Sequence, residues 1–279
     1  MLEIKNLTKE YFMGFKLDDV SFGLEPGYIM GFIGPNGAGK STTIKLIMNL
    51  IKKDSGQINI FGMDHVEEEK KIKDRIGFVY DEPYFYENFT IERMKNIIAP
   101  FYSKWDDELF YDYLKKFELK ANYQIKKLSK GMKMKFAIAV AISHHAELLI
   151  LDEPTAGLDP IVRREILDIL HGEILSSNTS ILISTHIISD IENIADYITY
   201  LNNGKLVFSE TKDDLLARYK IVKGDSKFLI NNMEKFIGSR QTDVGFVGLT
   251  KDIDRMDAKE DIIIESPSIE DIMYYYRGE

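Results

Sequence analysis

Apolar and polar positions follow two periods along most of the chain. Segments 2–7 and 20–24 alternate residue by residue and predict antiparallel strands at the start. After them, apolar strands and helices take turns, as in an open α/β sheet. The predicted strands are 28–33, 57–61, 76–80, 147–153 and 179–184, and the predicted helices are 41–51, 66–75 and 162–170. The pattern predicts a mixed α/β core with an antiparallel β subdomain.

The alternation stops at about residues 84–145, where the pattern becomes helical. Thr90 can cap one helix there, and Asp106 or Asp107 can cap the next, whose apolar residues share one face. We predict an inserted helical subdomain. Its aromatic residues form either its core or, in part, a docking groove for a partner helix: Tyr84, Phe85, Tyr86, Phe89, Phe101, Tyr102 and Trp105.

A predicted hairpin at 197–208 closes the core domain, which we expect to span residues 1–219. A small α+β extension, residues 220–279, follows. Its last helix begins at the capping pair Ser268 and Asp271, and its predicted strands are 227–230, 244–249 and 261–265. Because the extension has no catalytic constellation, it is either solvated acidic surface or a regulatory or dimer contact, and we favour the contact.

Composition narrows the function. The 36 basic and 45 acidic residues give a formal charge of −9, which argues against a nucleic-acid partner. The absence of cysteine excludes a disulfide and a thiolate metal site. The start of the chain lacks the layout of a signal peptide, and the uncharged run 136–146 is too short to span a bilayer. We expect a soluble chain, so that any membrane role needs another polypeptide.

The strongest motif is Gly34-Pro-Asn-Gly-Ala-Gly-Lys-Ser41, which fits the phosphate-binding loop G-x-x-x-x-G-K-[ST] and lies between a predicted strand and a predicted helix. Its glycines let backbone N–H groups approach phosphate, and the helix start adds positive potential. Lys40 is expected to reach the β- and γ-phosphates and Ser41 to ligate Mg²⁺. The expected nucleotide ligands are Gly34, Asn36, Gly37, Gly39, Lys40, Ser41 and Thr42.

Candidate catalytic and metal-binding residues also lie at the ends of predicted strands. Asp152 and Glu153 close the apolar strand 147–153, where two carboxylates cost desolvation unless they are paired or bind metal. We expect Asp152 to order Mg²⁺ through water and Glu153 to accept the proton of an attacking water. His186, after the strand 179–184, is placed to bind a γ-phosphate and to hold the catalytic carboxylate and water.

Two weaker signals accompany these motifs. Tyr11, ahead of the phosphate loop, can stack on a purine, although an ordinary half-buried tyrosine fits its context and Phe12 and Phe15 are rivals. Ser129 and Gly131 begin a helix in the way that anion sites do, although a plain helix cap explains them equally well.

Taken in chain order, these motifs resemble the nucleotide-binding subunits of ABC transporters over about residues 2–215. The resemblance rests on the phosphate loop, Leu128-Ser-Lys-Gly-Met132, Asp152-Glu153, Gly157-Leu-Asp159 and His186. It implies that Tyr11 stacks on adenine, that Asp159 is the D-loop aspartate, and that His186 is the switch histidine. It also implies that Ser129 and Gly131 are signature residues, which contact the nucleotide of a second subunit.

The resemblance also implies a mechanism. Two subunits, identical or different, close head to tail on two ATP molecules, and Glu153 with His186 then cleaves the γ-phosphate. The helical insertion and residues 81–101 are expected to grip a cytoplasmic helix of a transmembrane permease. The chain would then act at the cytoplasmic face of the cell membrane, driving export of a drug, antibiotic or lipid-like substrate, with ATP and Mg²⁺ bound.

Two departures from the family pattern stand out. Lys130 and Met132 replace the third and fifth residues of the usual Leu-Ser-Gly-Gly-Gln signature. Asp81 stands where the family has a glutamine that touches Mg²⁺; it can ligate the metal, but it adds negative charge beside the γ-phosphate. Both changes are similar to the antibiotic- and multidrug-export branch, whose subunits also carry a C-terminal extension.

Two other functions are compatible with parts of the pattern. A soluble ABC-type ATPase acting on ribosomes or DNA usually has two nucleotide domains or long coiled coils, and here there is one phosphate loop and no sustained heptad pattern. A regulatory subunit that binds ATP without hydrolysing it would not need Glu153 and His186. We therefore favour an active transport ATPase.

Overall fold

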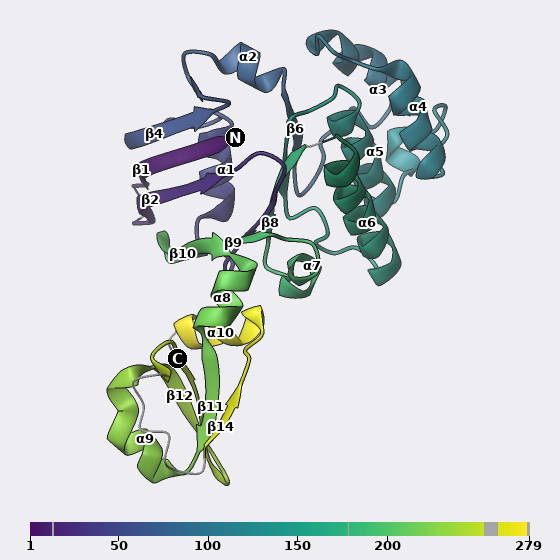
Figure 1. The fold of residues 1–279 in the computed structure, drawn as a ribbon. Coiled ribbons are helices and arrows are strands. Elements are labelled where there is room, and N and C mark those ends of the chain that lie inside the picture. The colour runs from purple at the N-terminus through teal and green to yellow at the C-terminus, as the bar shows by residue number, and fades with distance from the viewer. Residues whose placement is uncertain (13, 178, 254–261, 278–279) are drawn as a thin grey trace. The chain divides into compact units, whose positions relative to one another are not determined.

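The first part of the chain contains two sheets (Figure 1). The segments that alternate between apolar and polar residues form one sheet, and the continuous apolar segments form the other. The chain divides into two units, Met1–Ser209 and Glu210–Glu279. The division precedes the predicted boundary at 219 because α8, Lys212–Arg218, belongs to the second unit. The computed structural model describes residues 1–12, 14–177, 179–253 and 262–277.

Alternating residues form the first sheet, which is antiparallel. Its strands in spatial order are β2 Lys16–Leu24, β1 Leu2–Glu10, β4 Ser55–Ile60 and β5 Met63–Asp64. The first two strands are longer than predicted, because Glu10 still pairs with Lys16. Their buried side chains join those of α1, Lys40–Ile47, in one core cluster, as expected for a helix that is apolar on most sides.

The second sheet has six strands and contains the continuous apolar runs. Its order is β10 Lys205–Thr211, β9 Tyr197–Asn202, β3 Ile29–Ile33, β8 Ser180–Thr185, β7 Leu148–Asp152 and β6 Ile76–Val79. From β9 to β6 the neighbours are parallel. Every residue of β3, β7 and β8 is buried, as in a sheet covered on both faces. The ends of these three strands therefore meet at one edge.

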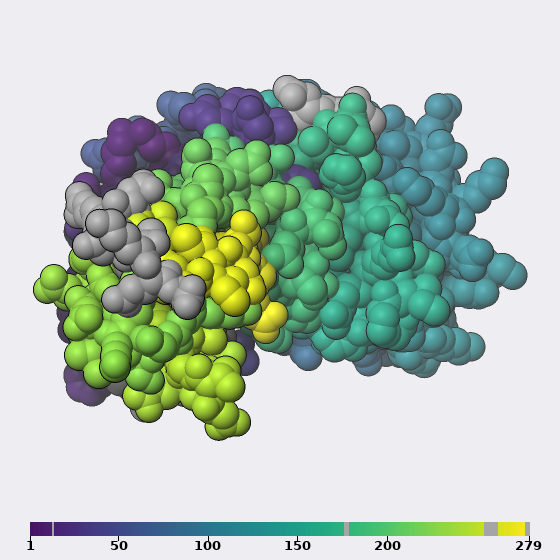
Figure 2. Space-filling view, turned by 60° about the horizontal axis from the view of Figure 1, so that its bottom comes forward, coloured from purple at the N-terminus to yellow at the C-terminus, as the bar shows by residue number. Residues whose placement is uncertain are grey.

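The helical insertion lies between β6 and β7 and forms one end of the first unit, coloured blue in Figure 2. It contains α3 Ile91–Ile98, η1 Ala99–Phe101, α4 Asp107–Lys116, η2 Ile125–Lys127 and α5 Lys130–Ile142. The predicted caps are confirmed: Thr90 accepts from the N–H of Arg93 at 3.1 Å, and Asp106 accepts from that of Leu109 at 2.9 Å.

The aromatic residues of the insertion divide between interior and surface. Phe85 and Phe110 pack on the buried Phe136, with ring centroids 4.6 and 6.4 Å apart, so part of the set is core. Tyr84 and Tyr86 are 83% and 65% exposed. These two side chains remain available for a docking surface.

Of the remaining helices of the first unit, two differ in length from the prediction, and the third was not predicted. They are α2 Glu69–Lys73, α6 Pro160–Ser177 and α7 Ile188–Glu192. The first is shorter than the predicted 66–75, because Asp64 accepts from the N–H groups of Val66 and Glu67 in a turn before the helix. Within the described ranges, no helix is both long and apolar enough to cross a membrane.

The second unit is an antiparallel sheet with helices. Its strands in spatial order are β12 Phe236–Thr242, β13 Gly245–Thr250, β11 Lys220–Gly224 and β14 Ile263–Glu265, and its other elements are α8, α9 Ser226–Asn232, η3 Met233–Lys235 and α10 Ile269–Arg277. The predicted capping pair is confirmed, since Ser268 and Asp271 exchange hydrogen bonds at the start of α10.

One predicted strand of this unit is wrong. Residues 227–230 belong to α9, because the Asp225 carboxylate accepts from the N–H of Phe228 at 2.8 Å and caps a helix. Phe228 and Leu229 are then buried in the core of the unit. The strand predicted at 244–249 corresponds to β13, and β14 covers 263–265 of the strand predicted at 261–265; residue 261 lies outside the described residues.

Candidate active site

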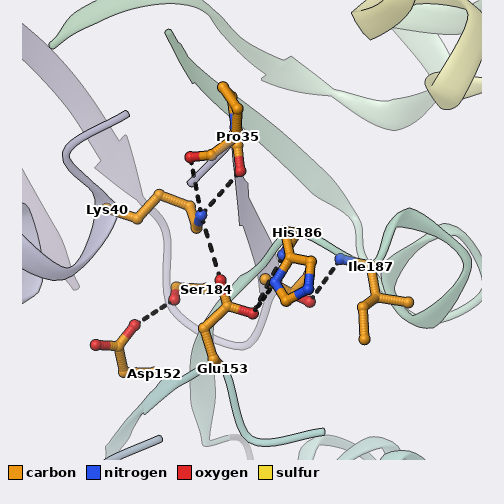
Figure 3. Close-up of polar contacts among 9 residues, drawn as sticks. Pro35, Lys40, Asp152, Glu153, Ser184, His186 and Ile187 are labelled. Carbon is orange, nitrogen blue, oxygen red and sulfur yellow. Dashed lines mark hydrogen bonds and ion pairs between the residues drawn. The ribbon is translucent and has the colours of Figure 1, made fainter. Parts of the chain in front are cut away.

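The phosphate loop joins β3 to α1, as the motif requires. A Cβ on Gly34 would lie 2.3 Å from the carbonyl oxygen of Leu201, so only glycine fits there. Gly37 and Gly39 have φ of 81° and 109°, in the left-handed region that favours glycine. The buried Lys40 bends back over the loop, and its Nζ donates to the carbonyl of Gly34 at 2.8 Å (Figure 3).

Glu153 connects the phosphate loop to the end of β8. Its Oε1 lies 3.2 Å from Nζ of Lys40, and its Oε2 lies 2.7 Å from Nδ1 of His186 (Figure 3). The backbone N–H of His186 also donates to Oε2, at 3.2 Å. Glu153 has a φ of 50°, unusual for a residue with a side chain, and such strain concentrates at functional sites. Three predicted site residues therefore converge.

Asp152 lies deeper, at the last position of β7. Its carboxylate accepts from Ser184 Oγ at 2.5 Å, and a hydrogen bond with Ser41 also acts on it. Burial raises the pKa of Asp152, and the charge of Asp81 adds to this effect, while the two serine hydrogen bonds oppose it. A buried carboxylate beside a serine hydroxyl offers the hard oxygen ligands that Mg²⁺ prefers.

Few side chains that could ligate a metal ion lie together at this site. Among the described parts of the chain, no three His, Cys, Asp or Glu side chains gather where they could hold a metal ion together. This fits Mg²⁺, which keeps several waters and is usually bound by one or two carboxylates together with substrate phosphates. The residues present therefore suit a metal that arrives with a nucleotide.

A cavity of about 590 Å³ opens over the phosphate loop. Of the predicted site residues, its lining contains Asn36, Gly37, Gly39, Lys40, Ser41, Thr42, Asp81, Glu153 and His186. The other lining residues are Phe15, Glu82, Lys130 and Ala156. Tyr11 is not among them, and Phe15 packs on the loop, with its Cζ 2.9 Å from where a Cβ on Gly39 would lie. Phe15, a rival of Tyr11 in the sequence analysis, precedes the phosphate loop by fewer residues than Tyr11 does, and this was the signal that could have favoured it.

The predicted signature and D-loop residues lie outside this lining. Ser129 caps α5 by accepting from the N–H of Met132 at 3.2 Å. Gly131 is buried, and a Cβ there would lie 3.0 Å from Val162 Cγ1, which is a tight contact. Asp159 accepts from the N–H groups of Ile161 and Val162, both at 3.1 Å. Within the chain these residues shape helix starts, so nucleotide contacts from them remain a prediction that requires a second subunit.

The fold and the site define a phosphate-loop ATPase with a helical insertion. The family model for ABC transporters matches residues 17–156. The chain is 38% identical over 220 residues to the bacitracin transport ATP-binding protein BcrA of Bacillus licheniformis, covering 78% of this chain and 72% of that protein. It is 34% identical over 216 residues to the lantibiotic transport ATP-binding protein SrtF of Streptococcus pyogenes, covering 76% and 92%.

Solved structures of ABC transporter subunits have a similar fold. An ATP-binding subunit of an ABC transporter superimposes with a TM-score of 0.71 at 31% identity, covering 78% of this chain and 92% of that one. A cassette dimer in a post-hydrolysis state with ADP and Pi has a TM-score of 0.68 at 27% identity, covering 76% and 98%. This chain belongs to the ABC transporter family. It is an ATP-binding and ATP-hydrolysing transporter subunit, which confirms the predicted family, fold class and activity.

Proposed function

We propose that this subunit drives export of a drug, antibiotic or lipid-like substrate by closing head to tail with a second nucleotide-binding subunit on two ATP molecules. It does so at the cytoplasmic face of the cell membrane, attached to a separate transmembrane permease. Its relatives support this, since they include bacitracin, lantibiotic and multidrug transport proteins. The observation that carries the chemistry is the convergence of Lys40, Glu153 and His186.

Hydrolysis then follows from these three side chains. When ATP enters, its β- and γ-phosphates compete with Glu153 for the Lys40 ammonium, which releases one carboxylate oxygen. That oxygen accepts a proton from the attacking water as the water oxygen bonds to the γ-phosphorus. The bond between the γ-phosphorus and the bridging oxygen breaks, and ADP is the leaving group. His186 holds the other oxygen of Glu153 and contacts the γ-phosphate.

Magnesium is assigned to Ser41, Asp152 and Asp81. When bound, Mg²⁺ neutralises charge on the β- and γ-phosphates. Asp152 is buried and oriented by Ser184, so its position is set before the nucleotide arrives. Asp81 lies at the rim of the same cavity and supplies a carboxylate where the family has an amide.

Contacts across the dimer complete the nucleotide site. Ser129, Gly131 and Asp159 are assigned to the nucleotide of the second subunit, whether that subunit is identical or different. Within the chain, Tyr11 is assigned to the adenine, with Phe15 as the alternative because it lines the cavity. A ring at either position can stack on a purine face.

The permease is assigned to the surface near residues 81–101. A groove of about 420 Å³ there is lined by Tyr84, Phe85, Ile125 and Leu128, among others. The buried Ile125 and Leu128 and the exposed Tyr84 offer apolar contacts, and the charged lining residues are Glu82, Glu87, Lys130 and Lys133, a mixture that suits an amphipathic helix. Residues 1–219 then form the nucleotide-binding domain, and residues 220–279 form an extension that makes a regulatory or dimer contact.

Affinity capture tests this proposal. The tagged full chain with Glu153→Gln is recovered, in the presence of ATP, from detergent-solubilised membranes of its native host. We expect one multi-span membrane protein to be recovered with it. Lys40→Ala, which lacks the phosphate ligand, is the matched control and is expected to lose the second nucleotide-binding subunit. Recovery of ribosomal or DNA-bound material without a membrane protein would contradict the proposal and favour a soluble ATPase.

A further inference from the structure

Asp190 is a buried carboxylate near the active site that the hydrolysis described above does not use. It lies in α7, the helix that begins directly after His186 and Ile187. Its side chain is only 5% exposed, and it pairs with Arg163 of α6, whose Nη1 lies 3.7 Å from Oδ1 of Asp190. Because a buried carboxylate costs desolvation unless it is paired, the place of Asp190 in the fold depends on Arg163.

The pair is poorly formed for its depth. Neither Arg163 Nε nor Asp190 Oδ2 has a hydrogen-bond partner among the described residues, although both atoms are buried. Arg75 and Glu147 differ, because their side chains are 32% and 38% exposed and yet they join through two hydrogen bonds, at 2.9 and 2.6 Å. Buried polar atoms are nearly always paired, so another constraint must keep Arg163 and Asp190 from closing into such a fork.

The packing of α7 on β3 is that constraint. Ile191, the residue after Asp190, lies against bare backbone, since a Cβ on Gly31 would be 2.2 Å from Ile191 Cγ2. Both Asp190 and Ile191 are buried, so α7 is held by an apolar contact to β3 and by a charge contact to α6. Closing the ion pair would draw the helix off the close-packed surface of β3.

The position of α7 determines that of His186. The backbone N–H of His186 and its Nδ1 both contact Oε2 of Glu153, at 3.2 and 2.7 Å (Figure 3), so the direction of the ring depends on the backbone there. Ile187 alone separates His186 from the first residue of α7, and its N–H donates to Thr185 Oγ1 at 2.9 Å. Over so short a connection, a displacement of α7 displaces the His186 backbone.

We propose that Asp190 and Arg163 are positioning residues for ATP hydrolysis. Their ion pair holds α7, and through α7 the ring of His186, in the orientation that contacts Glu153, which rests on the role proposed above for His186. Neither side chain lines the cavity over the phosphate loop. Loss of the pair should therefore slow hydrolysis and leave ATP binding intact.

The test is ATP hydrolysis by the full-length protein, with kcat and KM measured separately. We expect Asp190→Asn, which keeps the shape but removes the charge, to lower kcat about tenfold, as a small misplacement of a reacting group does. KM and the binding of a non-hydrolysable ATP analogue should change less than about twofold. Arg163→Gln should act like Asp190→Asn. Arg163→Lys should keep most of the rate, because the pair uses a single nitrogen of Arg163.

A His186→Ala background separates positioning from plain stability. If the pair acts through His186, Asp190→Asn should cause no further loss of single-turnover hydrolysis in that background. A further loss of about tenfold there would overturn the proposal, and so would a wild-type kcat in Asp190→Asn and Arg163→Gln. Wild-type hydrolysis by His186→Ala alone would show that the proposed role of His186 is wrong, and the role of the pair with it.

Glu147→Gln is the matched control, since it also turns a paired carboxylate into an amide, just before β7 and at the opposite end of that strand from Asp152. Chemical denaturation should show that both variants lose stability, but only Asp190→Asn should lose kcat. If Asp190→Asn does not fold, Arg163→Gln carries the test, because the Arg163 side chain is 28% exposed. An equal loss of kcat in Glu147→Gln would reduce the pair to a structural contact.

Discussion

Lys40 and Glu153 form an ion pair, 3.2 Å long, in which both side chains are nearly buried. The expected phosphate ligand and the expected base therefore neutralise each other inside the chain. Separating a buried pair leaves an uncompensated charge unless another group replaces the lost partner. In the proposed mechanism a γ-phosphate is such a replacement for Lys40, so that mechanism makes nucleotide binding and release of the base one event.

The first prediction concerns the base. Glu153→Gln should lower steady-state ATP hydrolysis at least about tenfold, because a positioned base is lost. ATP binding should persist, since the neutral amide no longer competes for Lys40. Phosphate release and analogue titration measure the two effects. Glu165→Gln, at an exposed residue paired with Lys135, is the control and should behave as wild type. Unchanged hydrolysis in Glu153→Gln would show that another group is the base.

The second prediction concerns Asp81. Asp81→Asn removes one of the carboxylates proposed to hold Mg²⁺, so the Mg²⁺ concentration for half-maximal analogue binding should rise about tenfold. Magnesium titrations at fixed analogue concentration measure this without hydrolysis. Glu82→Gln removes a charge from the next residue in the same cavity lining and should have a smaller effect. If the two variants shift equally, Asp81 acts only through its charge.

The third prediction separates the signature from a simple helix cap. Ser129 and Thr90 both cap helices, at 3.2 and 3.1 Å, so Ser129→Ala and Thr90→Ala should each lose about 1 kcal/mol of stability. Only Ser129→Ala should also lower hydrolysis by the dimer, by about tenfold or more, because it removes a contact to charge developing on the phosphate. Chemical denaturation and phosphate release measure the pair. A similar loss of hydrolysis in both variants would reduce Ser129 to a cap.

The fourth prediction concerns packing between β6 and α5. A Cβ on Gly77 would lie 2.3 Å from the carbonyl oxygen of Ala141 and 2.4 Å from Leu149 Cδ2, so Gly77→Ala should lower the free energy of unfolding by about 2 kcal/mol. Gly172→Ala is the contrast, because nothing lies within 4 Å of the added methyl group in α6. That change should raise stability by about 0.5 kcal/mol. Urea denaturation tests both, and equal effects would contradict the close contact.

The fifth prediction concerns the stability of the fold at acidic pH. Burial lowers the pKa of His144, which stacks on Tyr102 with ring centroids 3.8 Å apart. A histidine whose folded pKa is depressed contributes stability above its unfolded pKa and loses it as pH falls through the folded value. The free energy of unfolding should therefore fall as pH drops below 6.5, the ordinary value. His144→Phe keeps a stacked ring and should lessen this slope, whereas His171→Gln, at an exposed residue, should not.

Strand ends were the most predictable part of the site. Because parallel strands end at one edge, the positions of Asp152, Glu153 and His186 in the sequence already placed them together. The pairing of Glu153 with Lys40 was not predictable, since it depends on side-chain directions and on a φ of 50° at Glu153.

The wrongly predicted strand of the second unit lies in a segment whose local sequence fits a strand and a helix equally well. Residues 227–230 form a short, largely apolar run, which periodicity cannot assign to a strand or a helix. Asp225 was the usable signal, because an aspartate three residues before Phe228 can cap a helix. The extra length of β1 and β2 comes from backbone pairing between Glu10 and Lys16, whose polar side chains concealed the strands.

The contact at Gly77 has a mechanical consequence. Without a side chain between them, the backbones of β6 and α5 lie in close contact at Gly77 and Ala141. β6 leads to Glu82 and α5 begins at Lys130, and both residues line the same groove. Whatever occupies that groove therefore touches the end of β6 and the start of α5 at the same time.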